Sequence, residues 1–201
     1  MVPRLLKSFA AALLLMLCAG PALADVTVTF YAHPGNRISG GYLLFPHAYL
    51  HAEGTLDDTG ETVDWSAGFT ARNPGPQLLF AAGVGVVAEP DERYVDQGRP
   101  YVTVTLEDAA YRAMRAKADW WASPEGSRYD LRRRNCITFI AEMARMAGLV
   151  TGKEPSMSPG RFMEELVALN PSSSPPAPSG TPAPAVASAT AAEPPKAVAS
   201  P

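Results

Sequence analysis

The chain has 201 residues, with 17 Lys and Arg against 20 Asp and Glu and a formal net charge of −3. This acidic balance argues against a nucleic-acid partner, because binding a phosphate backbone needs clustered basic side chains and the one such run is Arg132–Arg134. The length suits one domain with a substantial core, once two compositionally distinct ends are set aside.

The first 24 residues have the pattern of a secretory signal peptide. Arg4 and Lys7 form a positive start, an apolar stretch follows at 10–17, and Pro21–Ala24 supplies the small residues that signal peptidase reads. The apolar stretch is about half of the roughly 20 residues that a membrane-spanning helix needs. We therefore expect cleavage after Ala24, no stable membrane span afterwards, and a periplasmic or secreted protein. Loss of the two basic residues would take the net charge from −3 to −5.

The other end, residues 171–201, consists almost entirely of Pro, Ala, Ser, Thr and Gly, with no aromatic residue. Such a segment cannot bury enough apolar surface to offset the entropy lost on ordering, so it is predicted to be a disordered tail. Residues 25–170 are then the folded domain.

Strand and helix patterns follow one another along residues 25–170. Strands are predicted at 26–32, 43–54, 61–70 and 101–106, a buried strand pair or bend at 78–87, and helices at 106–121, at 136–147 and from 159 onward. The turn Asp57–Gly60 joins the second and third strands into a hairpin. Strands before helices predict an α+β fold, an antiparallel sheet with helices packed on it, and we expect a monomer.

The chain has two cysteines, and signal cleavage would remove Cys18. Lipidation of Cys18 is the alternative, but Leu17 stands where that processing needs a small residue. The mature domain would keep a lone thiol, Cys136, in a compartment where cysteines normally pair. A buried core cysteine, an intermolecular disulfide and a residue without a role remain open as alternatives to a nucleophile.

The position of Cys136 favours the nucleophile. Apolar residues recur at helical spacing after it, Gly148 is a candidate helix terminator, and Asn135 is a preferred N-cap residue. Cys136 then lies in the first helical turn, where unpaired backbone N–H groups and the macrodipole favour a thiolate. The arginines at 132–134 would add positive potential.

A cysteine nucleophile needs a base, and the chain has three histidines. His33 lies in a Pro- and Gly-containing stretch that has the pattern of a turn. His47 and His51 share one face of a predicted strand, because residues two apart in a strand point to the same side. The pattern does not choose between these two.

A histidine on an early strand, and a cysteine that opens a late helix after an asparagine, resemble the circularly permuted branch of the NlpC-type papain-like superfamily. The matching pieces are Pro46–Leu50, Gly68–Ala71, and Tyr129–Leu131 running into Arg134–Phe139. This branch includes bacterial cell-wall amidase-like proteins and lecithin–retinol acyltransferase-like proteins. The resemblance implies a permuted papain-like fold over roughly residues 26–150, with Cys136 as nucleophile and His47 as base.

In that superfamily a third polar residue on the neighbouring strand orients the imidazole. With the predicted hairpin, the even-numbered residues of 61–70 face the side of His47, and Asp64 is the best of them by chemistry because a carboxylate stabilises an imidazolium. Ser66 and Thr70 lie closer to His47 in the simplest register, so Asp64 is not settled.

Together these features predict an exported thiol hydrolase or acyltransferase that acts on an amide or ester, with a peptidoglycan peptide amide as the substrate that the resemblance implies. A non-catalytic envelope module on the same fold is the alternative. A redox role is disfavoured because no resolving cysteine exists. The sequence contains no HExxH, Cys-x-x-Cys or phosphate-loop motif, so no metal or cofactor is expected.

Overall fold

The computed structural model describes residues 26–37, 43–44, 46–90, 92–153 and 158–173. The predicted signal peptide lies outside the described residues, as does the predicted tail from residue 174. Residues Pro171–Ser173, which the composition assigns to the tail, form a short 3-10 helix, η2, that contacts strand β7 (Arg99–Leu106). The folded part therefore extends a few residues beyond the predicted boundary.

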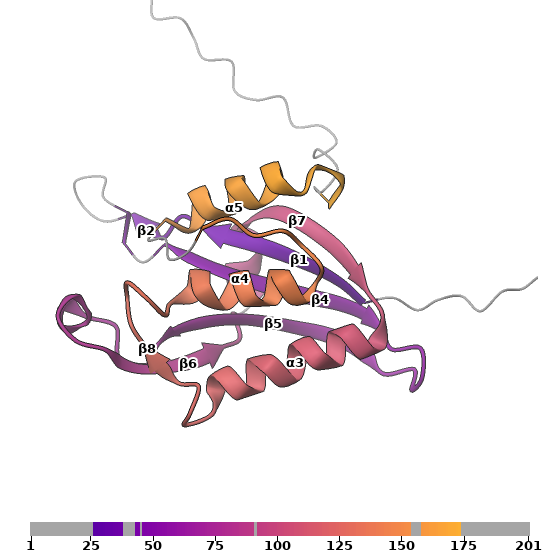
Figure 1. Cartoon of the computed structure of the whole chain (residues 1–201), viewed down its shortest axis with the longest axis horizontal. Helices are drawn as coiled ribbons and strands as arrows, with labels where there is room; N and C mark the ends of the chain where they lie inside the picture. Colours follow the sequence, from indigo (N-terminus) through magenta and orange to yellow (C-terminus); the bar gives the residue numbers. More distant parts are fainter. Residues whose placement is uncertain (1–25, 38–42, 45, 91, 154–157, 174–201) are drawn as a thin grey trace, which may run out of the picture.

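Six antiparallel strands form the central sheet (Figure 1), in the order β7-β1-β4-β5-β6-β8. Their bounds, besides those of β7, are β1 Val26–His33, β4 His47–Thr55, β5 Thr62–Ala71, β6 Gly83–Ala88 and β8 Arg128–Tyr129. A separate two-stranded ladder joins β2 (Asn36–Arg37) to β3 (Leu43–Leu44).

Three helices pack on one face of this sheet, and their contacts form the core. They are α3 Asp108–Ala122, α4 Cys136–Met146 and α5 Pro159–Leu169. Helix α4 crosses β4 and β5, α5 lies over β1 and β7, and α3 lies against β6 (Figure 1). Fully buried Phe30, Leu50 and Phe139 belong to the same apolar cluster. The predicted α+β fold, an antiparallel sheet with helices packed on it, is confirmed.

The β4–β5 hairpin has the predicted face pattern. Leu50 pairs with Ala67 and His51 with Ser66, so the even residues of β5 share a face with the odd residues of β4. This face lies opposite the three helices, and helix α2 (Glu92–Gln97) covers part of it. The hydroxyl of Tyr49 lies 3.3 and 3.2 Å from the backbone carbonyl oxygens of Tyr94 and Val95, which holds α2 against β4.

Several local predictions were wrong. The stretch 78–87 is a strand only from Gly83, and it follows a 3-10 helix, η1 (Pro76–Leu79), and an exposed Phe80. Its apolar residues resemble a buried strand in sequence, although Leu79 is 51% and Phe80 88% exposed. Helix α2 and strand β8 were not predicted. His33 is the buried last residue of β1, and the turn begins after it, with Gly35 at a φ of 90°.

No helix among the described residues is both long and apolar enough to traverse a bilayer.

Candidate active site

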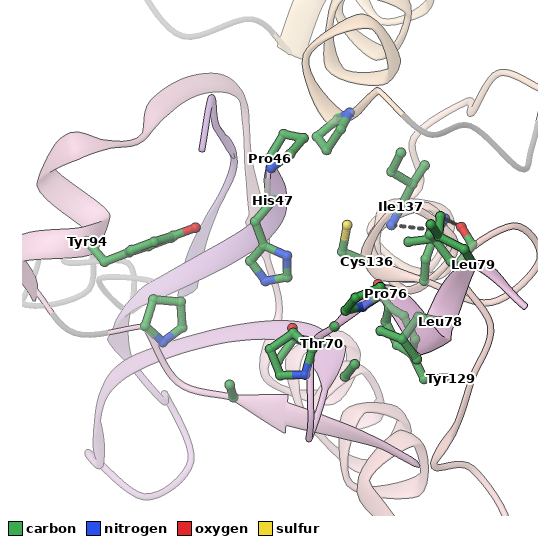
Figure 2. A pocket seen from close by; sticks show the side chains of 18 of the residues that line it. Pro46, His47, Thr70, Pro76, Leu78, Leu79, Tyr94, Tyr129, Cys136 and Ile137 are labelled. Carbon is green, nitrogen blue, oxygen red and sulfur yellow. Dashed lines mark hydrogen bonds between the residues drawn. The ribbon is translucent and has the colours of Figure 1, made fainter. Parts of the chain in front are cut away.

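A cleft of about 920 Å³ opens where β4 begins and β5 and β6 end (Figure 2). Cys136 lines it from the start of α4, and His47 lines it from the first residue of β4. Figure 2 shows the sulfur of Cys136 and the ring of His47 directed into the same space, with Tyr94 on the far side of the ring. The two residues that the sequence singled out therefore line the same cleft.

Asn135 places Cys136 at the helix start. Its side-chain oxygen accepts hydrogen bonds from the backbone N–H of Ile137 at 2.9 Å and of Thr138 at 3.2 Å. The Thr138 hydroxyl accepts one in return from the Asn135 N–H at 2.8 Å, which completes a capping box. The amide nitrogen of Asn135 also donates to the Leu131 carbonyl at 2.9 Å. The predicted cap is confirmed, and Asn135 joins the helix to the loop before it.

The arginines before Cys136 are structural elements of that loop. The Arg134 guanidinium lies 3.5 Å from the ring centre of Trp121 and donates to the Gly126 carbonyl at 2.6 Å. The backbone N–H groups of Arg132 and Arg133 bind the Asp130 carboxylate, and both side chains are exposed. None of the three side chains lines the cleft. The expectation that they add positive potential beside the thiol is therefore wrong.

The His47 ring lies close to a glycine of the neighbouring strand. A Cβ atom added to Gly68 would be 2.5 Å from Nε2 of His47 and 3.1 Å from Cβ of Tyr49. The ring of Tyr49 is roughly parallel to that of His47, with centroids 6.5 Å apart. The imidazole can therefore occupy this position only because residue 68 of β5 is a glycine and has no side chain.

The sulfur of Cys136 lies against the backbone of β4 next to His47. The N–H groups of Ala48, Ile137 and Cys136 itself favour the thiolate and lower the pKa of the thiol, but burial outweighs them and raises that pKa to about 11. The side chain is 7% exposed. The prediction of a stabilised thiolate is wrong for the free protein, because the thiol is enclosed by apolar neighbours.

Burial also shifts the pKa of His47, the candidate base. It lowers the pKa of His47 to about 4, and the neighbouring His33 lowers it further because two imidazolium charges would repel. His33 and His47 are cross-strand partners in the β1–β4 ladder. At neutral pH the free protein therefore holds a neutral thiol beside a neutral imidazole, and not an ion pair.

His33 and Tyr94 form the wall behind His47. The His33 ring stacks on Tyr94 with centroids 4.3 Å apart, and its Nδ1 accepts a hydrogen bond from the Gly35 N–H at 3.0 Å. With Nδ1 as acceptor, the neutral His33 carries its proton on Nε2.

Asp64 is not brought to His47. The register pairs it with Glu53, its side chain is 81% exposed, and its nearest imidazole is His51, at 3.9 Å. His51 also contacts Ser66, with Nδ1 2.9 Å from the hydroxyl. The two strands are antiparallel, so Asp64 lies near the turn that joins β4 to β5. His47 lies at the opposite end of β4. Asp64 therefore cannot orient His47.

No described residue forms a hydrogen bond with the His47 ring. Thr70 lines the same cleft from β5 (Figure 2), whereas Ser66, the other predicted alternative, does not line it. Among the described residues, no group of His, Cys, Asp and Glu is arranged to hold a metal ion.

Sequence reasoning missed Tyr94 and the segment Pro74–Phe80, which we call the rim segment. Residues of this segment line the cleft beside Tyr129 and Ile137. The sequence does contain a signal for this segment. Pro74, Gly75 and Pro76 are typical of a loop, so a strand is not expected to begin directly after them. Gly68 appeared in the quoted motif, but its contact with His47 depends on strand register.

We predict that Gly68→Ala displaces the His47 ring, because the added methyl would stand 2.5 Å from Nε2. The free energy of unfolding should fall by about 1–3 kcal/mol, as for other overpacked sites, and the NMR-measured pKa of His47 should rise toward its ordinary value. Gly160→Ala is the matched control, since its Cβ would meet only the Tyr101 hydroxyl, at 3.9 Å. An unshifted His47 resonance in Gly68→Ala would contradict this placement of the ring.

Asn135→Ala should destabilise the protein by about 0.5–2 kcal/mol, since the cap accepts two backbone N–H groups. Asn135→Asp keeps an acceptor and should retain most of that stability. Glu107→Ala serves as control, because Glu107 is the N-cap of α3 but makes no side-chain cap bond. Chemical denaturation measures all three, and equal losses in Asn135→Ala and Glu107→Ala would refute the cap's contribution.

The neutral thiol predicts a particular pH dependence of alkylation. With the pKa of Cys136 raised to about 11, the thiolate fraction and the iodoacetamide rate should rise about tenfold per pH unit from pH 6 to 10. His47→Gln should leave this slope unchanged. Mass spectrometry of the Cys136 peptide gives the rate, and a plateau that begins near pH 5 would indicate an ion pair instead.

No model of a protein family matches this chain, and no curated protein sequence matches it. Among solved structures, the fold is similar to the crystal structure of a type VI secretion system effector, TseH, with a TM-score of 0.47 and 20% sequence identity. The alignment covers 76% of this chain and 91% of that one. A likeness of this size shows neither a family nor an activity.

Proposed function

We propose that this chain is an exported thiol hydrolase or acyltransferase that acts on an amide or ester carbonyl, with Cys136 as nucleophile and His47 as general base. The observation that carries the proposal is that both side chains line one cleft, although they come from distant parts of the chain. The signal peptide predicted for the first 24 residues supports the location, and the resemblance to permuted NlpC-type proteins supports the reaction class.

The resting pair is neutral, so proton transfer accompanies attack. His47 takes the thiol proton as the sulfur bonds to the carbonyl carbon, and the carbonyl oxygen becomes an oxyanion. When the tetrahedral adduct collapses, the bond to the leaving amine or alcohol breaks and His47 returns the proton to it. Water or an acceptor alcohol or amine then attacks the thioester, His47 again takes and returns a proton, and the thiol is regenerated.

Backbone N–H groups near the sulfur are suited to the oxyanion. Those of Ala48 and Cys136 already lower the pKa of the thiol, so they lie close to the sulfur and are candidates to bind the oxyanion that forms on the adjacent carbon. The Ile137 N–H is engaged by Asn135. Ala48 follows His47 directly on β4, so the general base and one donor belong to the same rigid strand.

A peptidoglycan peptide amide is the substrate that the resemblance and the expected location favour together. Asp64 has no part in the proposal, and the base would act without a carboxylate partner among the described residues. A non-catalytic envelope module is the second candidate, favoured by one observation: burial raises the pKa of Cys136 instead of lowering it.

Cys136→Ser should abolish hydrolysis of p-nitrophenyl acetate and the mass shift of the acetyl-thioester. His47→Gln should lower kcat/KM by about 10²–10⁴, the usual contribution of a general base. His51→Gln is the matched control, because His51 shares the strand and face of His47 but does not line the cleft, and it should retain full activity. Equal rates for Cys136→Ser and the unaltered protein would leave the envelope module as the better account.

A further inference from the structure

Exposed apolar side chains gather at the end of the sheet where β5 connects to β6. The rim segment belongs to this connection, which projects beyond the sheet (Figure 1). Leu79 is 51% exposed and Phe80 88%, and Val84, the second residue of β6, is 50% exposed. Large apolar side chains that are grouped on the surface, unlike those scattered singly, mark an interaction site. This end of the sheet therefore offers apolar surface to a partner.

Arginines flank the apolar side chains. Arg72 directly follows β5, and its N–H donates to the carbonyl of Val84 at 2.8 Å. On the other side of β6, Val84 pairs with Arg128 of β8. Both arginine side chains are exposed, as are those of Arg132 and Arg133 in the turn after β8. Val84 thus lies between two guanidinium groups, with two more on the adjoining turn.

The charge of this end differs from that of the chain as a whole. Residues 72–88 and 127–134 contain five arginines and a single acidic residue, Asp130, whereas the chain has a net charge of −3. Arg134 packs against Trp121. The other four guanidinium groups form no ion pair with any residue that the structure describes. They are therefore available to an anionic partner.

We propose that this end of the sheet docks on the surface of a bilayer that contains anionic phospholipids. The guanidinium groups would bind lipid phosphates, and the exposed apolar side chains would enter the boundary between headgroups and acyl chains. We call this surface the docking face, and it comprises Arg72, Leu79, Phe80, Val84, Arg128, Arg132 and Arg133. Docking makes no use of the Cys136 sulfur, so the inference goes beyond the proposed thiol chemistry and does not depend on it.

The composition and shape of the docking face favour a bilayer over other anionic partners. A free phosphate ion would bind the arginines alone and leave Phe80 in water. A stable protein interface buries about 800 Å² on each partner around an apolar centre, whereas the apolar side chains here are few and lie on a projecting connection. A fluid bilayer adapts to a projecting side chain and presents hydrocarbon directly beside phosphate, which matches both parts of the docking face.

Co-sedimentation with vesicles tests the proposal. Residues 25–201, the expected mature chain, are used so that the apolar stretch of the predicted signal peptide does not itself bind lipid. Vesicles of phosphatidylcholine and phosphatidylglycerol in equal parts should bind this chain. Phosphatidylcholine alone should bind it roughly 100-fold more weakly, since each arginine near an anionic surface contributes about fivefold. Added salt should weaken the binding by screening. No binding to either vesicle would overturn the proposal and favour a protein partner for the exposed apolar side chains.

Single charge variants locate the surface. Arg72→Gln and Arg128→Gln should each weaken binding to the mixed vesicles about fivefold. Arg112→Gln is the matched control, because it removes the same charge at the opposite end of β5, where Arg112 contacts Asp58 near the β4–β5 turn. It should leave the binding unchanged. Equal losses in all three variants would indicate a response to net charge alone and would contradict docking through this face.

A fluorescence measurement tests the insertion of the apolar tip. With mixed vesicles that carry brominated acyl chains, Phe80→Trp should show a blue shift and quenching beyond those of the unaltered chain. Leu169→Trp is the control, since Leu169 is an exposed apolar residue, 42% exposed, at the end of α5 and outside the docking face. It should show neither change. Equal quenching in the two variants, or none in Phe80→Trp, would refute insertion at this end of the sheet.

Docking and thiol chemistry are tested separately. Cys136→Ser should bind the mixed vesicles as the unaltered chain does, and p-nitrophenyl acetate hydrolysis is measured without lipid. Vesicle binding without any hydrolysis would refute the proposed enzyme and keep the docking face. Hydrolysis without vesicle binding would refute the docking face and keep the enzyme.

Discussion

The burial of the Cys136 sulfur between the start of α4 and the backbone of β4 is the constraint on which the site depends. Two opposed effects act on the thiol there. Backbone N–H groups and the helix macrodipole favour the thiolate, with a dipole contribution of typically 0.3–1 kcal/mol, while desolvation favours the neutral thiol. Desolvation wins and raises the pKa to about 11. Since His47 is buried in the same cleft and its pKa falls to about 4, the pair is neutral, and charge should develop only when a carbonyl is attacked.

Two rigid supports hold this arrangement. On one side Asn135 caps α4 and binds the Leu131 carbonyl, while Arg134 stacks on Trp121 and fixes the approach of the chain to Cys136. Trp121 in turn donates to the Glu142 carboxylate at 2.7 Å, which ties α3 to α4. On the other side, the strand ladder and Gly68 set the His47 ring. The nucleophile and the base are therefore attached to different layers of the fold, and their proximity requires the helix and the sheet to pack as they do.

The β4–β5 register divides the two strand histidines between different surroundings. His47 is at the end that opens into the apolar cleft, whereas His51 is farther along the same face among Ser66, Asp64 and Glu53. A carboxylate would suit a histidine that must stabilise a positive charge, yet the acidic residues gather around the other one. The cleft consequently carries few ionisable side chains among its described lining residues, with Glu89 as their one carboxylate.

The sequence by itself determined the elements whose signals are local. Alternation predicted β1, β4, β5 and β7, helical spacing predicted α3 and α4, and the Asn135 cap placed Cys136 in the first turn, because each of these depends on residues only a few positions apart. Only the tertiary structure decided that His47, and not His51, lines the cleft with Cys136, and that Asp64 lies away from it. It also decided that burial raises the thiol's pKa, against the lowering expected at a helix start. These outcomes depend on strand register and on enclosure by distant segments such as the rim segment and α2. The pKa of the thiol depends on how far these distant segments exclude water from the sulfur. Reasoning from residues adjacent in the sequence cannot predict that exclusion.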